Sequence, residues 1–531
     1  MLAVLLSLDW SRAMHPSPQT VRNRSARSRI ELFAESLNAR PGLLLRSYSI
    51  ITLVITFGVA MRRPTWVDEI FTIRLSSFNS FGELIAALQA GMDGHPPLSY
   101  MATHAFFLVA GNSVLVSRIP AMLGFWLMGF FAYRYVSFRY KPLWGIAAAL
   151  FPFVTSYYYF AAEARPYGIV LGATAAAMAS WQSAASGVRR RISLVFLVLA
   201  ILVIVCSHYY GLLLIIPLLV GELTRTILMR KADWPVIVSS LLPFGAVVVF
   251  LPLIHAGMTA FGAHPWDPPS ITNLLASYTN PMLVYSDLGS SGRGVAGLAL
   301  FMVLAGSFLL AYPFKSSVGL PVALPPLHET TAAFGFLLLP LAGYLTAIVK
   351  THQYHPRYAI PILVGYTLLF GFAAAHLFRR HAVYALAVNG ILLLGFLVNG
   401  AVQFRQAPSP TEGCPVAPAA GPFANLPVVM GNHNDYVRCN FYASPELKSK
   451  MVFVADPVLS LRYLGFDVAD KDLMVAKDVV GLHVVRFDDF RGAYRQFLLV
   501  GIDGWVGRHY LNLGAKIELL PNSLYLVTDA K

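Results

Sequence analysis

Apolar runs long enough to cross a membrane dominate the chain up to residue 402. A membrane-crossing helix needs about 20 mostly apolar residues. Runs of this kind occupy residues 43–61, 115–133, 143–160, 166–186, 192–207, 208–227, 236–255, 293–313, 331–349, 358–377 and 382–402. The pattern predicts an α-helical polytopic membrane protein with about 11 spans, within a range of about 11 to 13.

Two segments decide this span count. The apolar stretch 193–228 is too long for one span, and the polar sequence Ser207-His208-Tyr209-Tyr210 divides it at a membrane surface. Segment 98–110 is apolar but too short to cross a bilayer. We therefore expect it to form a juxtamembrane helix in the interface.

The pattern changes after Pro408-Ser409-Pro410, a proline-rich linker. Short apolar runs then alternate with helix-like stretches such as residues 489–495. The apolar runs lie at residues 427–430, 451–455, 496–501, 517–520 and 524–528. The sequence therefore predicts a small α/β domain at 403–531 that follows a transmembrane domain at 43–402.

Composition excludes an ordinary soluble enzyme. Hydrophobic residues make up 56% of the 531 residues and charged residues only 12%, whereas soluble domains carry about 25% charged residues. The net charge is +14, but residues 403–531 contain 13 basic and 13 acidic residues, so the whole excess precedes them. It falls mostly in short loops between apolar runs, which indicates membrane topology and argues against nucleic-acid binding.

Basic residues are retained in cytoplasmic loops. We therefore expect residues 1–42 to form a cytoplasmic N-terminal arm, together with four cytoplasmic loops at residues 134–141, 189–191, 225–231 and 379–380. The first loop, 62–114, and the domain 403–531 then lie on the extracytoplasmic side. The compact tail and the lack of a eukaryote-like luminal insert favour the plasma (inner) membrane of a prokaryote.

Cys414 and Cys439 both fall in the tail that we place outside the cytoplasm, where a disulfide can persist. They are a candidate disulfide pair, and two separate thiols are the alternative, because sequence does not reveal proximity. Cys206 lies in an apolar run and is typical of a small core residue.

Four polar clusters share the predicted outer surface. They are Trp66-Val67-Asp68-Glu69, Asp93-Gly94-His95-Pro96-Pro97-Leu98, Glu163-Ala164-Arg165-Pro166-Tyr167-Gly168 and His352-Gln353-Tyr354-His355-Pro356-Arg357-Tyr358. Ionisable groups at a membrane are costly to desolvate, so they mark a candidate reaction centre. Each also has a plainer interpretation, because acidic residues cap helices, arginines snorkel to head groups and histidines join aromatic belts.

In this order the clusters resemble the GT-C glycosyltransferases. The resemblance rests on Asp68-Glu69 after the first span, His95-Pro96-Pro97-Leu98 in the same loop, Glu163-Ala164-Arg165-Pro166-Tyr167 after the third span, and Arg357-Tyr358-Ala359-Ile360-Pro361 late in the membrane region. The nearest branch is the dolichyl-phosphate-mannose protein mannosyltransferase-like family 39, with the lipid-A aminoarabinose transferases as relatives. The resemblance covers residues 44 to about 400 and leaves the C-terminal domain outside it.

The resemblance implies a hexosyl- or pentosyltransferase that moves a sugar from a polyprenyl-phosphate carrier to a glycan, lipid or protein acceptor. The carrier would reach the site laterally from the membrane lipids. A hydroxyl acceptor must lose its proton as the new bond forms, and Asp68 is the candidate general base. Glu69 is the second catalytic candidate, which would orient the acceptor or bind a divalent cation. A divalent cation at Glu69 is the candidate cofactor.

Cationic or hydrogen-bonding groups must stabilise the leaving phosphate. The candidates are Arg165 and Arg357, whose guanidinium groups match phosphate oxygens, with Tyr167 and Tyr358 beside them. The remaining site-shaping candidates are Glu163, expected to position Arg165, and the three histidines His95, His208 and His355.

Three other functions fit parts of the pattern. A transporter or flippase of lipid-linked sugars also has many spans, although related halves and midplane polar residues are typical of transporters and neither is visible here. An O-antigen polymerase or ligase also uses lipid-linked sugars, but it lacks this early Asp-Glu pair. An inactive family member would keep the fold without turnover.

Overall fold

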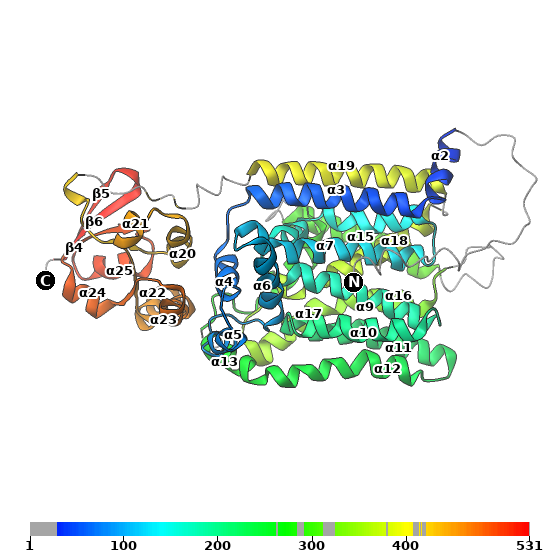
Figure 1. Ribbon diagram of the computed structural model, residues 1–531, viewed down its shortest axis with the longest axis horizontal. Helices are drawn as coiled ribbons and strands as arrows, with labels where there is room; N and C mark the ends of the chain where they lie inside the picture. Colours follow the sequence, from blue (N-terminus) through cyan, green and yellow to red (C-terminus); the bar gives the residue numbers. More distant parts are fainter. Residues whose placement is uncertain are drawn as a thin grey trace, which may run out of the picture.

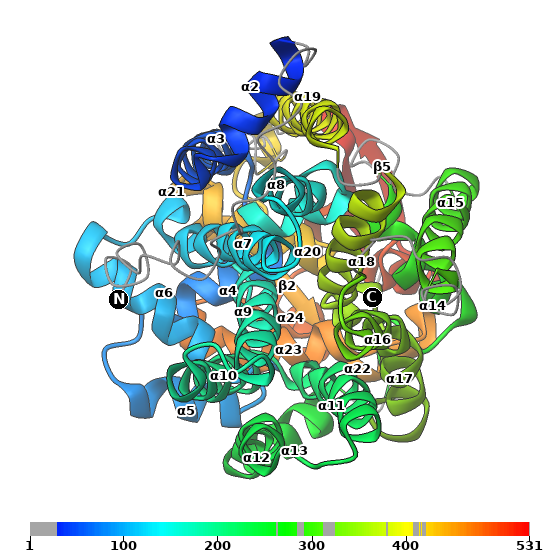
Figure 2. The ribbon, with the colours of Figure 1, turned by 90° about the vertical axis from the view of Figure 1, so that its right-hand side faces the viewer.

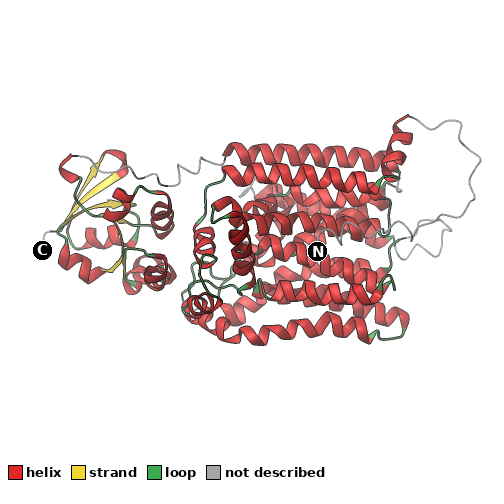
Figure 3. Ribbon diagram, viewed as in Figure 1, coloured by secondary structure: helices red, strands yellow, loops and turns green. Residues whose placement is uncertain are grey.

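The computed structural model describes residues 29–261, 264–283, 291–311, 324–378, 381–406, 414, 416 and 421–529. Long helices run alongside one another in a bundle, and the C-terminal domain lies at one end of that bundle (Figure 1). Strands occur only in the C-terminal domain among the described residues (Figure 3). Most of the N-terminal arm, the loop at 379–380 and the proline-rich linker lie outside the described residues.

The predicted spans coincide with helices of the bundle, seen end-on in Figure 2. The bundle elements are α2 (Arg29–Asn38), α3 (Pro41–Arg62), α7 (Val114–Ser137), α8 (Pro142–Leu150), η2 (Phe151–Val154), η3 (Ser156–Ala162), α9 (Tyr167–Ala185), α10 (Arg190–Val205), η4 (Tyr209–Leu214), α11 (Ile215–Met229), α12 (Trp234–Leu241), η5 (Leu242–Phe250), α13 (Leu251–Phe261), α14 (Ile271–Thr279), η6 (Asn280–Met282), α15 (Ser291–Leu310), α16 (Leu327–Gly335), η9 (Phe336–Leu338), α17 (Leu339–Thr346), η10 (Ala347–Thr351), η11 (Pro356–Ala359), α18 (Ile362–Leu377) and α19 (Ala382–Gln406).

Seven helices among the described residues are long and apolar enough to cross a membrane, and an eighth is added if the bent pair Pro142–Val154 and Ser156–Ala162 is one span. The protein is therefore a mostly helical polytopic membrane protein. The sequence predicts about 11 spans, and this count is reached only if α9, α10 and α18 also cross the membrane. Of these, α10 and α18 have only 16 residues each, and α9 is rich in alanine.

Three helices of the first loop cover the end of the bundle next to the C-terminal domain. They are α4 (Val67–Leu75), α5 (Phe81–Gln89) and α6 (Leu98–Ala110). Figure 1 shows α4 and α6 running across the direction of the long helices. The 13-residue α6 is too short for a span, and its placement is that expected of a juxtamembrane segment.

Small residues bring α7 and α9 into close contact beneath this end. A Cβ atom added to Gly124 would lie 2.3 Å from the carbonyl oxygen of Gly168, and one added to Gly172 would lie 2.3 Å from that of Gly124. Glycines at this spacing let helix backbones approach closely in membrane bundles. The packing fixes the start of α9, which begins at Tyr167, two residues after Arg165.

The polar sequence at 207–210 interrupts the apolar stretch as predicted. Helix α10 ends at Val205, and the 3-10 helix η4 begins at Tyr209. His208 lies in the break, where it is buried. The break therefore places a polar side chain at the covered end of the bundle.

The C-terminal domain is a six-stranded sheet with helices, as predicted. Its strands have the order β3-β2-β1-β4-β6-β5, parallel from β3 to β4 and antiparallel through β6 and β5. The strands are β1 (Val428–Met430), β2 (Met451–Ala455), β3 (Val484–Arg486), β4 (Gln496–Val500), β5 (Lys516–Leu520) and β6 (Leu524–Thr528). The helices are α20 (His433–Tyr442), α21 (Pro445–Lys450), α22 (Pro457–Leu464), α23 (Val468–Val480), α24 (Phe487–Ala493) and α25 (Trp505–Asn512).

Sequence analysis located five of these strands and missed β3. The missed strand has three residues and ends in a charged side chain, so it carries little apolar signal. The stretch predicted as helical at 489–495 is α24, shifted by two residues. Cys414 and Cys439 are joined by a disulfide, which ties the start of the domain to α20.

Candidate active site

The four polar clusters meet at the end of the bundle that faces the C-terminal domain. Asp68 lies on α4, Arg165 immediately before α9, and Arg357 on η11. Arg357 Nη1 donates to Asp68 Oδ2 at 3.1 Å, and Arg165 Nε lies 3.9 Å from the same oxygen. Residues separated by up to 289 positions thus form one site around a single carboxylate.

The two arginines keep Asp68 ionised. Burial by itself would raise the pKa of this carboxyl, but the charges of Arg357 and then Arg165 outweigh it and lower the pKa below its usual value. The Asp68 side chain is 25% exposed, while that of Arg165 is 4% exposed. The carboxylate is therefore the accessible group, and the guanidinium is held beneath it.

Asp93 holds Arg165 in place, a role that sequence analysis did not assign to it. Arg165 donates to both Asp93 oxygens, from Nη1 at 2.5 Å and from Nη2 at 3.3 Å. His95 Nδ1 lies 2.8 Å from Asp93 Oδ1 and 3.0 Å from Arg165 Nη2. Burial opposes ionisation of Asp93, but Arg165 and His95 keep its pKa well below the usual value. Arg165 is therefore not a snorkelling residue.

Glu69, the second catalytic candidate, is fully buried in an ion pair with Arg118. Its side chain and that of Arg118 are 0% exposed, and Arg118 donates from Nε to Oε1 and from Nη2 to Oε2, each at 2.8 Å. The N–H of Ala164 donates to Oε1 at 2.8 Å and that of Trp66 to Oε2 at 3.0 Å. Both oxygens are occupied, so Glu69 positions α4 against the segment before Arg165.

Arg118 extends this anchor to the end of α3. Its Nη1 donates to the carbonyl oxygens of Ala60 and Arg63, and its Nη2 donates to that of Pro64. Helix ends leave carbonyl groups without partners, and a buried guanidinium can satisfy several of them. One arginine therefore joins α3, α4 and α7 directly behind Asp68.

Glu163 does not position Arg165, contrary to the sequence-based expectation. In the described part of the chain its buried Oε2 has no hydrogen-bond partner. Burial raises the pKa of the Glu163 carboxyl to about 7. No hydrogen bond joins its carboxyl to Arg165 among the described residues, where Asp93 provides the clamp.

Aromatic and imidazole rings line the other side of the site. The ring of His208 lies 5.0 Å from His95, 5.7 Å from Tyr167 and 6.2 Å from Tyr358, measured between centroids. His355 lies 6.3 Å from Tyr358. The five rings of His95, Tyr167, His208, His355 and Tyr358 therefore form one cluster next to Asp68 and the two arginines.

Several buried donors around Asp68 have no acceptor among the described residues. They are Nε of Arg165, Nε of Arg357, the Tyr167 hydroxyl and Nε2 of His208. Buried polar groups are normally paired. Donors that remain open around two guanidinium groups fit an anionic ligand such as a phosphate. No group of three or more His, Cys, Asp or Glu side chains suited to a metal ion occurs within the described ranges.

The C-terminal domain contributes to this end of the bundle. The N–H of Thr65 donates to the hydroxyl of Tyr442 on α20 at 2.9 Å. Burial lowers the pKa of His433 to about 4, although the charge of Asp68 opposes this shift. Burial, followed by the charges of Asp93 and Asp68, raises the pKa of Asp472 well above its usual value. Two titratable groups of this domain thus face the site, and nothing in the sequence had marked them.

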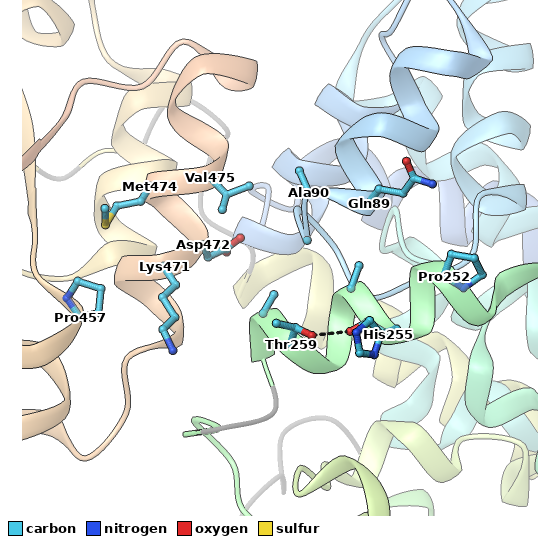
Figure 4. Close-up of a pocket in the computed structure, with 13 residues that line it drawn as sticks. Gln89, Ala90, Pro252, His255, Thr259, Pro457, Lys471, Asp472, Met474 and Val475 are labelled. Atoms are coloured by element: carbon cyan, nitrogen blue, oxygen red, sulfur yellow. Dashed lines mark hydrogen bonds between the residues drawn. The ribbon is translucent and has the colours of Figure 1, made fainter.

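A groove of about 740 Å³ separates α23 of the domain from α5 and α13. Figure 4 shows Asp472 and Val475 on one wall, with Ala90 and Gln89 opposite. Its lining is mostly apolar and comprises Gln89, Ala90, Gly91, Pro252, His255, Ala256, Thr259, Ala260, Pro457, Lys471, Asp472, Met474 and Val475.

Comparison with solved structures identifies the fold. The crystal structure of ArnT from Cupriavidus metallidurans in the apo state superposes with a TM-score of 0.54 at 13% identity, covering 91% of this chain and 97% of ArnT. The same protein bound to undecaprenyl phosphate gives 0.53 at 15% identity with the same coverage. The chain has the GT-C fold. An oligosaccharyltransferase from Archaeoglobus fulgidus is more distant, with a TM-score of 0.48 at 12% identity over 91% of this chain and 73% of that one.

The GT-C fold confirms the resemblance found in the sequence at the level of architecture. No protein-family model matches the sequence. No curated protein matches it either. The reaction of this protein therefore has to be argued from its own site.

Proposed function

We propose that this protein is an integral membrane glycosyltransferase of the GT-C kind. It would take a sugar from a polyprenyl-phosphate carrier and transfer it to an acceptor on the extracytoplasmic face of a prokaryotic plasma membrane. The observation that carries the proposal is the pair Arg165 and Arg357 on either side of Asp68, with an open Nε donor on each arginine.

The two guanidinium groups provide the phosphate site in this proposal. Burial disfavours their charge, but Asp93 and Asp68 keep the pKa of Arg165 above the usual value, and Tyr167 and then Asp68 do the same for Arg357. They therefore remain cations in a poorly hydrated site, where charge-assisted hydrogen bonds to phosphate are strong. Tyr167 and Tyr358 lie beside them as neutral donors.

The reaction follows from these positions. The acceptor hydroxyl oxygen bonds to the anomeric carbon while the bond from that carbon to the carrier phosphate oxygen breaks. The hydroxyl proton passes to Asp68, and the carrier phosphate leaves as an anion held by Arg165 and Arg357. The positive charges of the two arginines lower the pKa of Asp68. A bound phosphate would partly neutralise these charges, so donor binding would raise the pKa of Asp68 and make it a better base.

The groove between α5, α13 and α23 is the proposed approach for the acceptor. It lies beside the site and carries Asp472 at one wall. His95 and His208 would shape the space between acceptor and phosphate, because their rings pack together there. The C-terminal domain would thus close the site from outside the membrane.

The direct test supplies the purified protein in lipid nanodiscs with a panel of polyprenyl-phosphate hexoses and pentoses. The expected result is release of polyprenyl phosphate from one of them, with the sugar appearing on an added acceptor fraction from membranes. A protein that only transports lipid-linked sugars would bind the donor and leave it intact. Intact donor across the panel would contradict the proposal.

We expect Arg165→Lys and Arg357→Lys each to weaken binding of polyprenyl phosphate by roughly 10- to 150-fold. Lysine keeps the charge but loses the planar fork, and one charge-assisted hydrogen bond contributes about 1.5 to 3 kcal/mol. Titration calorimetry with polyprenyl phosphate measures the effect. Arg62→Lys is the matched control, because Arg62 is an exposed arginine at the last residue of α3. Unchanged affinity in both site variants would remove the phosphate role.

The proposed orientation predicts on which side of the membrane each loop lies. The prediction assumes about 11 spans, each of about 20 residues. Reporter fusions after Arg190 and Arg380 should be cytoplasmic, and those at Thr279 and Lys531 extracytoplasmic, because basic loops are retained inside. Paired alkaline phosphatase and fluorescent protein fusions measure this. A cytoplasmic C-terminus would rule out an extracytoplasmic site.

A further inference from the structure

Trp266 is a large aromatic side chain left open beside the proposed phosphate site. It lies between α13 and α14 and is 44% exposed. Its ring centroid lies 5.6 Å from that of His355, and Arg357 Cζ lies 5.8 Å from the indole centroid. Arg357 in turn donates to Asp68 at 3.1 Å. One guanidinium therefore separates the indole from the proposed general base.

The backbone around Trp266 is fixed to the segment that carries Arg357. The N–H of Tyr354 donates to the carbonyl oxygen of Asp267 at 3.1 Å. Asn273 Nδ2 donates both to Asp267 Oδ1 at 2.6 Å and to the carbonyl oxygen of Tyr354 at 3.1 Å. These bonds hold the indole at a set position relative to Arg357, which is what a preformed ligand surface requires.

The combination of an open indole face and an adjacent cation fits one part of the proposed donor. A sugar attached to a phosphate lies one oxygen atom away from it, so the sugar of a donor held at Arg357 reaches the neighbouring side chains. The C–H face of a pyranose or furanose is apolar and carries slight positive charge, and it packs on the negative face of an aromatic ring. Asp267 is the next residue after Trp266, and its Oδ1 accepts from Asn273 Nδ2. An ionised carboxylate has further lone pairs that accept from hydroxyl groups such as those of a sugar.

We propose that Trp266 forms the subsite for the sugar ring of the donor, with Asp267 as the hydroxyl-binding side chain next to it. This inference rests on the proposed glycosyl transfer. In this subsite Trp266 contacts the sugar and does not contact the polyprenyl chain of the carrier. The indole then distinguishes a loaded carrier from the spent polyprenyl phosphate, which favours release of the spent carrier after transfer.

The test compares two ligands on the full-length protein in nanodiscs. The ligands are bare polyprenyl phosphate and the polyprenyl-phosphate sugar of the panel that binds most tightly. Trp266→Ala should weaken binding of the loaded carrier by about 3- to 10-fold, the effect of one aromatic stacking contact, and leave bare polyprenyl phosphate unaffected. Trp266→Phe should restore most of the loss. Trp234→Ala is the matched control, because Trp234 is 67% exposed at the start of α12.

Three outcomes would overturn the subsite. Equal weakening of both ligands would make Trp266 a contact for the carrier chain, and no change in either would make it a membrane-interface residue. Weakening of the bare carrier alone would also exclude a contact between Trp266 and the sugar. Failure of the phosphate site is distinguished by Arg165→Lys, which is tested on bare polyprenyl phosphate alone.

Discussion

Asp68→Asn should reduce the rate of sugar transfer by about 10²-fold or more, up to about 10⁴-fold, because an amide cannot accept the acceptor proton. The substitution preserves the size of the side chain. It also removes an anion that competes with the carrier phosphate for Arg165 and Arg357, so donor affinity should stay the same or rise. Single-turnover assays with the active donor measure the rate, and calorimetry measures the affinity.

Asp435→Asn is the control for Asp68→Asn, because Asp435 is 43% exposed on α20. A fall in rate together with an unchanged melting temperature and a donor affinity that is no weaker supports the role of a base. If the variant instead turned over normally, Asp68 would lose that role. Glu69 would not replace it, because both of its oxygens are occupied by Arg118 and backbone N–H groups.

Arg118→Leu should destabilise the folded protein by about 3 to 5 kcal/mol, because it leaves the charge of Glu69 buried without a partner. The ion pair lowers the pKa of Glu69 although burial opposes this. The variant also deprives three carbonyl groups at the end of α3 of their donor. We expect a much lower melting temperature and a smaller monodisperse peak in detergent.

Two further variants make the Arg118 result specific. Arg74→Leu, on the exposed face of α4, should change stability by no more than about 0.5 kcal/mol. Arg118→Leu combined with Glu69→Leu should recover part of the loss, since it removes the unpaired charge but not the open carbonyl groups. Wild-type stability in Arg118→Leu alone would show that this pair does not anchor the site.

The candidate chemistry was readable in the sequence because it depends on residue type and order. Asp68, Arg165 and Arg357 stood out as charged residues at the ends of apolar runs, where they are costly to retain. The structure gathers them, together with the five predicted rings, at one end of the bundle. Which carboxylate faces which guanidinium was not readable, because those partners come from distant parts of the chain. For this reason the neighbouring side chains differ in exposure: Asp68 is 25% exposed, whereas Glu69 is fully buried.

The sequence alone determined the helices of the membrane region, most of the sheet and the chemical types at the site. Apolar runs and alternating patterns arise from burial within single elements, so they are local. Only the tertiary structure decided that Asp93 clamps Arg165, that Arg118 neutralises Glu69, and that Trp266 and Asp472 border the site. Ion pairing and exposure depend on which elements pack together, and that information is spread over the whole chain.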